Sequence, residues 1–443
     1  MNKFFITTLG CKVNQCESEL IAKSLTEAGW RHAGKDEKAD VCIINTCTVT
    51  QKASMQSRQA IRKAIRANPG ACVVATGCYA QTEPGEIRKI KGADCVIGHA
   101  DKHKIPEMIG NWKLETGNWE PEIGNRKPDN QFSRTRSFLK IQDGCNAFCT
   151  YCIVPYARGR SRSMPVENVL DNIRQLKQTG FREVVLSGIH IGTYGLDLSP
   201  EANLTGLLHR INDSNLIERV RMSSIEPHEL TCDIIKLVAA SDIFCKHFHI
   251  PLQSGDDHIL KKMHRPYSNS FFRDLVLKIK EFIPDAGIGV DILVGFPGET
   301  ETAFENTYKT VEELPVTYLH VFPFSSREGT PAHSYPDKVP QNIIKTRSQR
   351  IRELGNNKKN EFYKGHIGKT VEVLIESTRD RATGLLKGVT SNYIPVLLSG
   401  EDDLKNSLVR VRVDNVDDNN TVWEHSQSVD SKMESILTSW IPG

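Results

Sequence analysis

Short apolar runs separated by longer polar segments recur along most of this chain. In the amino-terminal region three such runs, at residues 4–9, 41–44 and 71–75, have the length and content of buried parallel strands. A segment whose Ala and Ile spacing suits an amphipathic helix, residues 51–66, follows the second run. We therefore predict an α/β fold that opens with a Rossmann-like domain over residues 1–130.

The middle of the chain repeats the order of a short apolar run and a helical segment six times. This repeat is typical of a parallel α/β barrel. Because a closed barrel of this type has eight repeats, six repeats predict a partial (β/α)6 barrel, which we place at residues 131–365. The predicted strands are residues 138–142, 183–187, 220–224, 248–251, 289–294 and 318–323.

From residue 368 the pattern changes to short alternating strands broken by Gly and Asp. Such strands favour a small β-barrel, which we place at residues 366–430. The last residues, 431–443, are polar and are predicted to form a tail. The predicted strands of the barrel are residues 370–377, 385–389, 394–398 and 408–413.

Composition narrows the class of protein. A length of 443 residues fits two or three domains of about 150 residues each. No apolar run reaches the ~18 residues needed to span a bilayer, so we expect no membrane role. The chain has twelve cysteines, but it is too long for a small disulfide scaffold and lacks a credible signal peptide. We therefore expect reduced cysteines and a cytoplasmic location.

Three cysteines in the middle of the chain form the motif with the clearest chemistry. Cys145, Cys149 and Cys152 have the spacing C-x3-C-x2-C, and Tyr151 precedes the last of them. A cubane iron–sulfur cluster has four irons, so three thiolates leave one iron open to a small molecule. In a closed structural metal site, protein side chains would fill every coordination position of the metal. The alternatives are a zinc site that lacks one ligand and a chance cluster.

A second set of cysteines lies in the amino-terminal region. Cys11, Cys47 and Cys78 each come just after one of the predicted strands. Because the carboxyl ends of parallel strands meet at one edge of a sheet, these three thiolates can converge on one metal site. We expect the other cysteines to be buried small hydrophobic residues. These are Cys16, Cys42, Cys72, Cys95, Cys232 and Cys245.

The central motif resembles the signature of the radical S-adenosylmethionine superfamily. With the three amino-terminal cysteine loops, the chain closely resembles the methylthiotransferases, a branch of that superfamily. The resemblance implies two 4Fe-4S clusters, the second of them on Cys11, Cys47 and Cys78. It also implies S-adenosylmethionine as a methyl donor and as the source of a 5'-deoxyadenosyl radical, with Tyr151 against the adenine.

The resemblance also implies which residues hold S-adenosylmethionine. In the superfamily a strand end with small residues lies near the methionine amine, a Glu and a Gln near the ribose, and an Arg on the carboxylate. An Asp also contributes. The matching positions here are Ser187, Gly188, Glu226, Gln253, Arg265 and Asp291.

Basic residues gather in several segments. Residues 51–66 carry five Lys and Arg and no Asp or Glu. Residues 341–364 carry seven Lys and Arg and only two Glu. Such clusters suit a polyanion partner, and solvated helix faces are the alternative. The carboxy-terminal region resembles the RNA-binding TRAM domain, although residues 366–424 hold seven basic and ten acidic residues. Further basic residues flank the central motif: Arg134, Arg136, Lys140, Arg158, Arg160 and Arg162.

Methylthiotransferases act on isopentenyl-adenosine in tRNA, on threonylcarbamoyl-adenosine in tRNA, or on an aspartate of a ribosomal protein. Residues 10–15 and 152–159 most resemble the second group, although Cys16 stands where that group usually has Tyr. The resemblance thus implies a monomeric enzyme that methylthiolates adenine C2 beside the anticodon. Its partners would be the tRNA anticodon loop and a flavodoxin- or ferredoxin-type electron donor. The other two substrates, and a non-catalytic zinc RNA-binding protein, are the alternatives.

Overall fold

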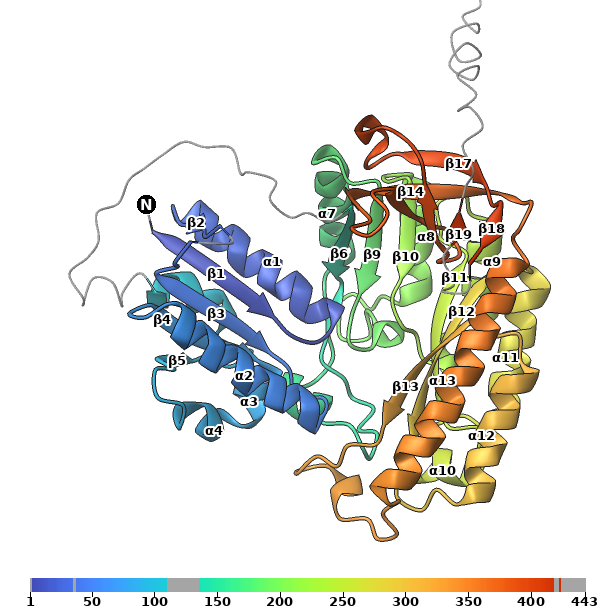
Figure 1. Cartoon of the computed structure of the whole chain (residues 1–443), viewed down its shortest axis with the longest axis horizontal. Coiled ribbons are helices and arrows are strands. Elements are labelled where there is room, and N and C mark those ends of the chain that lie inside the picture. The colour runs from blue at the N-terminus through green and yellow to red at the C-terminus, as the bar shows by residue number, and fades with distance from the viewer. Residues whose placement is uncertain (1, 35–36, 110–134, 418–421, 424–443) are drawn as a thin grey trace, which may run out of the picture.

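The computed structural model describes residues 2–34, 37–109, 135–417 and 422–423. Three sheet-containing parts follow one another along the chain (Figure 1). The predicted boundaries at residues 130 and 430, the tail at 431–443 and Arg134 lie outside the described residues. No helix in the described ranges is long and apolar enough to span a membrane.

The first part is a five-stranded parallel sheet in the order β2-β1-β3-β4-β5. Every residue of β3 and β4 is buried, and alternate side chains of each strand enter two different apolar clusters, one on each face. A parallel sheet covered on both faces confirms the Rossmann-like prediction. The strands are β1 (Lys3–Thr8), β2 (Arg31–His32), β3 (Val41–Thr46), β4 (Cys72–Gly77) and β5 (Cys95–Val96), and the helices are α1 (Lys12–Glu27), α2 (Gln51–Ala67), α3 (Cys78–Thr82) and α4 (Pro84–Arg88).

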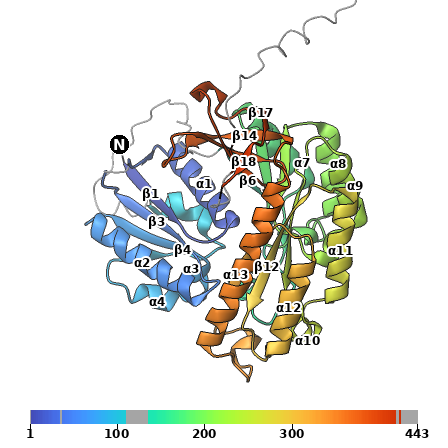
Figure 2. The ribbon, with the colours of Figure 1, turned by 45° about the vertical axis from the view of Figure 1, so that its right-hand side comes forward.

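The second part contains the six predicted barrel strands in two parallel sheets, β10-β9-β6 and β11-β12-β13. A parallel bridge between Val220 and Phe244 links the two sheets. The largest apolar cluster is made of residues from these strands and from the helices beside them, which Figure 2 shows. This open arrangement confirms the partial barrel. The strands are β6 (Arg136–Lys140), β9 (Glu183–Ser187), β10 (Arg219–Met222), β11 (His247–Gln253), β12 (Gly287–Val294) and β13 (Tyr318–Pro323).

Helices follow the barrel strands, and two short strands flank the central cysteine motif. The short strands β7 (Gln142–Asp143) and β8 (Arg162–Ser163) pair antiparallel. The helices are α6 (Val154–Arg158), α7 (Val166–Gln178), α8 (Leu204–Ser214), α9 (Cys232–Ala240), α10 (Asp257–Lys262), α11 (Asn269–Phe282), α12 (Glu301–Glu313) and α13 (Gln341–Lys364).

The third part is a six-stranded sheet in the order β17-β14-β15-β16-β19-β18, which includes the four strands predicted for this region. It is antiparallel except for the pair β16 and β19. The strands are β14 (Thr370–Arg379), β15 (Leu386–Thr390), β16 (Pro395–Leu398), β17 (Leu408–Arg412), β18 (Asn415–Val416) and β19 (Val422–Trp423).

The third part covers the amino-terminal end of the barrel. Arg219, the first residue of β10, donates to the carbonyl of Val389 at 3.2 Å. The first residue of β12, Gly287, lies so close to Asn392 that a Cβ there would be 2.2 Å from its carbonyl oxygen. The third part therefore leaves the carboxyl ends of the barrel strands uncovered, where a functional site can form. The carboxyl ends of β1 and β3 point toward the barrel (Figure 1).

Candidate active site

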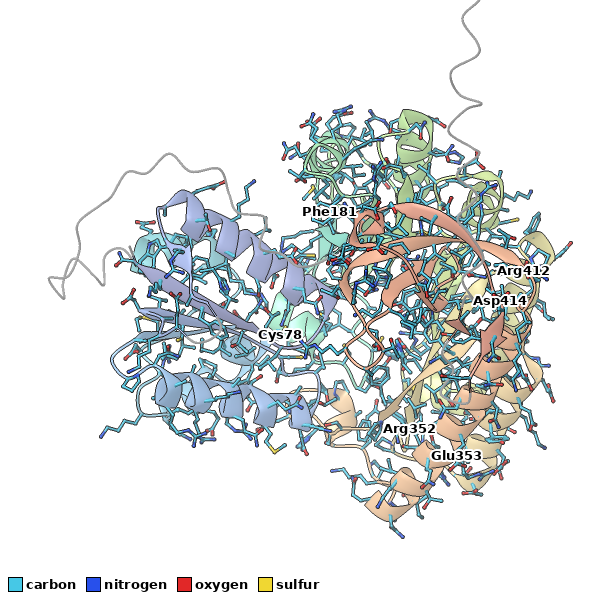
Figure 3. The ribbon with its side chains drawn as sticks, turned by 45° about the horizontal axis from the view of Figure 1, so that its top comes forward. Cys78, Phe181, Arg352, Glu353, Arg412 and Asp414 are labelled. Atoms are coloured by element: carbon cyan, nitrogen blue, oxygen red, sulfur yellow. The ribbon has the colours of Figure 1, made fainter. Side chains whose placement is uncertain are left out.

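The three amino-terminal cysteines converge at the edge of the first sheet. Cys11 precedes α1, Cys47 follows β3, and Cys78 opens α3; Cys78 lies on the side that faces the barrel (Figure 3). A Cβ on Gly10 would be only 2.8 Å from Cys47 Sγ, so the first two loops are in contact. Burial, with the nearby Cys78 and Cys11 thiols, raises the pKa of Cys47 to about 11. The structure thus brings together the predicted set.

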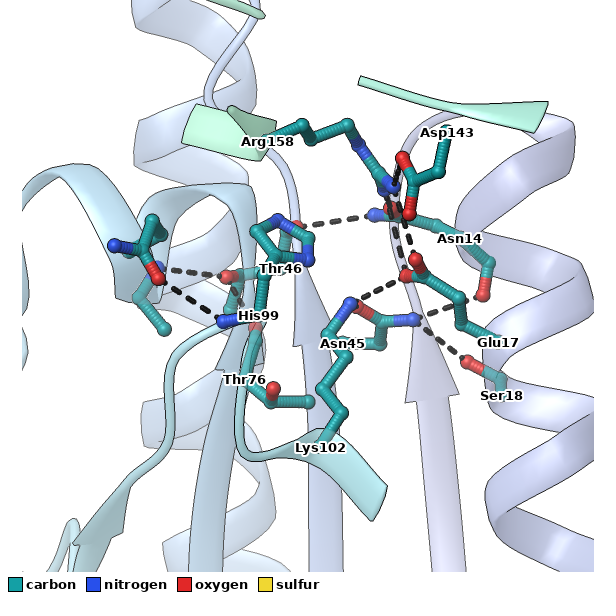
Figure 4. Close-up of polar contacts among 12 residues, drawn as sticks. Asn14, Glu17, Ser18, Asn45, Thr46, Thr76, His99, Lys102, Asp143 and Arg158 are labelled. Carbon is teal, nitrogen blue, oxygen red and sulfur yellow. Dashed lines mark hydrogen bonds and ion pairs between the residues drawn. The ribbon is translucent and has the colours of Figure 1, made fainter. Parts of the chain in front are cut away.

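Two buried asparagines and a glycine hold these loops together (Figure 4). Asn14 donates from Nδ2 to the carbonyls of Leu9, at 2.7 Å, and Thr46, at 3.0 Å. Asn45 donates to the carbonyl of Asn14 at 2.8 Å. Gly77 has φ +95°, and a Cβ there would lie 2.4 Å from the Thr46 carbonyl. Only glycine therefore allows β4 to run this close to β3 before Cys78.

The three central cysteines lie between β7 and α6. Burial, with the nearby Cys149 and Cys145 thiols, raises the pKa of Cys152 to about 12. The ring of Tyr151 meets that of Phe296 edge to face, 6.5 Å between centroids. All twelve cysteines of the chain are free thiols, so these three remain available as metal ligands.

Arg265 connects two of the predicted site residues. Its Nη1 donates to Cys149 Sγ at 3.3 Å, and its Nη2 pairs with the Glu226 carboxylate. Its Nε donates to Tyr267 Oη at 2.9 Å, and Tyr267 donates to the carbonyl of Pro251 at 2.7 Å. This buried guanidinium is therefore fixed beside the central cysteines by Glu226, which follows β10, and through Tyr267 by Pro251 of β11.

Ser187, Gly188 and Gln253 lie at the carboxyl ends of their strands, as predicted. Ser187 is buried and donates to the carbonyl of Val185 at 3.2 Å. A Cβ on Gly188 would lie 2.9 Å from Gln142 Oε1. Gln253 ends β11 with φ +67°, a left-handed conformation that is uncommon for a non-glycine residue.

Asp291 makes its contacts with two histidines and not with Arg265. Its Oδ1 accepts a hydrogen bond from His249 Nε2 at 2.7 Å and lies 3.3 Å from His320 Nδ1. Burial opposes ionisation of Asp291, but these two imidazoles hold the pKa of its carboxyl well below the usual range. The carboxylate predicted to contact S-adenosylmethionine is therefore already engaged by two histidines.

Gln142 and His190 were not identified from the sequence. Gln142 Oε1 accepts from the backbone N–H groups of Ile189, at 3.0 Å, and His190, at 2.8 Å, while its Nε2 donates to the Gly144 carbonyl at 2.8 Å. His190 Nδ1 lies 3.3 Å from Cys145 Sγ. These side chains fasten the central cysteine loop to the loop after β9. No spacing or composition signal distinguishes either residue in the sequence.

A buried ion network joins the first sheet to the barrel (Figure 4). Arg158, 3% exposed at the end of α6, donates from Nη1 to Glu17 Oε1 at 2.9 Å and to Asp143 Oδ1 at 2.8 Å. Lys102 and Lys140 also pair with Glu17. Burial opposes ionisation of Glu17, but the three cations hold its pKa well below the usual range. The network thus connects the helix that follows Cys11 with the segment that follows Cys152.

A second contact joins the same two parts on the side of the Cys47 loop. Arg327, in the segment after β13, donates to Thr48 Oγ1 at 2.7 Å and to Glu83 Oε1 at 2.6 Å. Gln51 donates its backbone N–H to Ser325 Oγ at 2.9 Å. Both contacts come from chain segments next to a cysteine loop, so they fix how the first sheet faces the barrel.

Several basic residues that the sequence suggested for a polyanion have other roles. Arg158 is buried as described, Arg136 pairs with Glu376, and Arg347 of α13 is buried against Glu299. For Arg158 and Arg347 the surface interpretation was wrong, because sequence does not show burial. The helix α2 differs. It carries four exposed basic residues that form no ion pair within the described ranges. These are Lys52, Arg62, Lys63 and Arg66.

Comparisons with known proteins agree with this site. Residues 3–98 match the family described as "Uncharacterized protein family UPF0004", and residues 139–311 match the radical SAM superfamily. The solved structure of TsrM from Kitasatospora setae, a radical S-adenosylmethionine methyltransferase, has a TM-score of 0.55 at 14% identity and covers 75% of this chain and 77% of its own. That likeness supports the fold. The barrel and the central cysteine motif define a radical S-adenosylmethionine enzyme.

Relatives that match most of the chain narrow this class. Threonylcarbamoyladenosine tRNA methylthiotransferase MtaB of Bacillus subtilis is 39% identical over 418 residues, 92% of each chain. A tRNA-2-methylthio-N(6)-dimethylallyladenosine synthase of Clostridium botulinum is 37% identical over 429 residues, 93% of this chain and 94% of its own. The chain belongs to the radical S-adenosylmethionine methylthiotransferase family.

Membership in the superfamily implies S-adenosylmethionine and a 4Fe-4S cluster. The central loop fits that cluster, because three neighbouring free thiols stand beside a buried arginine that donates to one of them. Cys145, Cys149 and Cys152 would hold it. The bound cluster would supply the electron for radical formation.

Because Arg158 belongs to this buried network, we expect Arg158→Gln to destabilise the protein strongly. Removing one partner of a buried ion pair leaves an unpaired charge, so we expect the free energy of unfolding to fall by about 3–5 kcal/mol. The nearby exposed Arg160 provides the control. Arg160→Gln should change the free energy of unfolding by less than about 0.5 kcal/mol. Denaturant titration under anaerobic conditions would measure both. Equal stability of the two variants would show that the network contributes little.

Proposed function

We propose that this protein is a tRNA methylthiotransferase that adds a methylthio group to adenine C2 of N6-threonylcarbamoyladenosine next to the anticodon. The observation that carries this proposal is the presence of two three-cysteine sets on two parts that face one another across a buried ion network. The similarity to the B. subtilis enzyme supports the choice of substrate.

The chemistry explains why two sets are needed. The adenine C–H bond is unactivated, so acid–base groups cannot open it near neutral pH and a cofactor radical is required. We assign the second 4Fe-4S cluster to Cys11, Cys47 and Cys78. S-adenosylmethionine bound to the enzyme would supply both the methyl group and the radical. The protein contributes position, because two cysteine sets on facing parts hold sulfur and radical source on either side of one adenine.

Binding of tRNA would rely on the exposed basic face of α2, which follows the Cys47 loop. Such binding weakens at raised salt, because phosphate contacts release counterions. We assign residues 1–130 to the methylthiotransferase domain, 131–365 to the barrel and 366–430 to a TRAM-like module. We further propose a cytoplasmic monomer that receives electrons from a flavodoxin- or ferredoxin-type donor.

The dimethylallyladenosine substrate is the second candidate, because relatives named for it match this chain almost as well. A direct assay separates the two. Purified enzyme, S-adenosylmethionine and a chemical reductant would be incubated without oxygen with tRNA that carries either modification, and the nucleosides identified by mass spectrometry. Methylthiolation of the threonylcarbamoyl tRNA alone is the expected result. Methylthiolation of the dimethylallyl tRNA alone would refute the substrate assignment.

Metal content tests the two cysteine sets. Protein purified without oxygen should hold about eight irons per chain, and the triple variant Cys145→Ala/Cys149→Ala/Cys152→Ala should hold about four. Iron, sulfide and zinc analysis with the visible spectrum would measure this. Zinc without iron would eliminate the radical mechanism. Loss of all iron in the variant would show that the amino-terminal cysteines hold no cluster.

Gly10 and Gly70 form a matched pair that tests the amino-terminal site alone. Both have positive φ, +95° and +85°, but a Cβ on Gly10 would meet Cys47 Sγ at 2.8 Å, whereas a Cβ on Gly70 would have nothing within 4 Å. Both Ala variants share the backbone strain. Only Gly10→Ala should displace Cys47 and lose about four irons. Full iron content in Gly10→Ala, measured beside Gly70→Ala, would contradict the assignment.

A further inference from the structure

The loops after β9 and β10 carry polar side chains that the proposed reaction has not used. The two strands are neighbours in one parallel sheet, so the loops lie side by side at its carboxyl edge. His190 lies in the first loop, and Glu226 and Glu229 lie in the second. Glu226 already pairs with Arg265 at the central cysteines. Glu229 and the imidazole of His190 have no role in the reaction so far.

The imidazole of His190 lies between a cysteine and a carboxylate. Its Nδ1 is 3.3 Å from Cys145 Sγ, and its Nε2 is 2.9 Å from Glu229 Oε1. Only 8% of His190 is exposed, so both contacts are largely shielded from water. A hydrogen bond in such surroundings is stronger than one in water. The carboxylate therefore holds the ring with its other nitrogen directed at the cysteine.

The local backbone leaves little freedom to this pair. Gln142 Oε1 accepts from the backbone N–H of His190 at 2.8 Å, and Thr193 Oγ1 donates to the carbonyl of His190 at 2.8 Å. A Cβ on Gly192 would overlap the carboxylate of Glu229, so this glutamate packs directly against the loop that carries the histidine. The fold thus fixes both members of the pair.

A bound cluster would set the direction of the hydrogen bond at Cys145. A cysteine that ligates a metal is a thiolate and carries no proton. His190 Nδ1 is then the donor, because the sulfur only accepts. The carboxylate of Glu229 also only accepts. An imidazole that carries a proton on each nitrogen satisfies both neighbours.

The same segment after β10 supports a second donor. Glu226 pairs with Arg265, whose Nη1 donates to Cys149 Sγ at 3.3 Å. Glu229 comes three residues later, at the end of the 3-10 turn Pro227–Glu229. One short segment therefore supplies the carboxylates behind two N–H donors, and each donor reaches a different cysteine of the central set.

Hydrogen bonds to the ligating sulfurs are one of the factors that set the reduction potential of an iron–sulfur cluster. Reduction adds one electron to the cluster, so the reduced state is the more negative one. An N–H donor at a ligating sulfur stabilises that state more than the oxidised state. The electron comes from an external donor, and no bond of the protein forms or breaks in this step.

We propose that His190, held by Glu229, donates to Cys145 and raises the reduction potential of the central cluster. His190 is a positioning residue, because it acts on the cluster through Cys145. With Arg265 at Cys149, the segment 226–229 then acts on the potential through two sulfurs at once. The inference requires the central cluster and no particular modified adenosine, so it does not rest on the substrate assignment.

Redox titration of the cluster-loaded enzyme tests the proposal. Dithionite would be added with redox mediators in the absence of oxygen, and EPR would follow the reduced clusters. The signal that is missing from the triple variant Cys145→Ala/Cys149→Ala/Cys152→Ala belongs to the central cluster. In His190→Leu this signal should titrate at a more negative potential. At the wild-type midpoint, its reduced-to-oxidised ratio should fall about threefold to tenfold, the range expected for one hydrogen bond.

Three further substitutions separate the hydrogen bond from packing. An asparagine amide places an N–H near the position of Nδ1, so His190→Asn should titrate closer to wild type than His190→Leu does. Glu229→Asp keeps the charge but withdraws it from His190, and should shift the potential in the same direction by a smaller amount. His209→Leu changes an exposed histidine of α8 and should titrate as wild type.

A label on histidine keeps the test decisive if His190→Leu loses iron. In protein whose histidines carry nitrogen-15, pulsed EPR of the reduced central cluster should show a weak magnetic coupling to a histidine nitrogen. That coupling should be absent from His190→Asn. A wild-type protein without the coupling would overturn the proposal and needs no substitution at the site.

Other results would also contradict the proposal. One is an unchanged potential in His190→Leu that retains its full iron content. Another is an equal shift in His190→Leu and His190→Asn, or an equal shift of every cluster signal, because packing would then explain the change. A wild-type potential in Glu229→Asp would overturn the role of Glu229. None of these results bears on which adenosine is modified, which the nucleoside assay decides separately.

Discussion

The buried ion pair between Arg158 and Glu17 fixes the arrangement on which the rest of the site depends. Arg158 belongs to the segment that follows the central cysteines, and Glu17 belongs to the helix that follows Cys11. Buried charges are strongly destabilising when they lose their partners. The two parts therefore cannot slide or open at this point without exposing or orphaning several charges at once. The relative position of the two cysteine sets follows from this constraint.

The direction of parallel strands explains why both sets lie at the same place. In parallel sheets, loops at the carboxyl ends of the strands gather at one edge and carry the functional residues. The third sheet covers the amino-terminal end of the barrel through Arg219 and the first residue of β12. The first sheet faces the opposite side with its own carboxyl ends. The fold therefore directs two separate functional edges toward one another.

The sequence predicted what depends on periodicity and spacing. The six barrel strands and both cysteine sets were predicted because apolar runs mark buried strands and because thiols at strand ends converge. What depends on burial was not predictable. Arg158 and Arg347 were interpreted as surface charge, although both are buried in ion pairs. Gln142 ends a predicted strand, but its hydrogen bonds join residues 144 and 189, and only the folded chain brings these together.

An arginine that pairs with a glutamate acts on a thiol of each cysteine set. At the central set Arg265 pairs with Glu226 and donates to Cys149. At the amino-terminal set Arg158 pairs with Glu17, and its positive charge opposes the rise in the pKa of the Cys78 thiol that burial causes. In the Arg265 pair Glu226 binds one N–H of the guanidinium, and the planar fork of the guanidinium directs another N–H at Cys149 Sγ. A hydrogen bond and a positive charge at a ligand sulfur favour the more negative, reduced state of an iron–sulfur cluster. A lysine ammonium lacks this fork, so arginine suits the position beside Cys149.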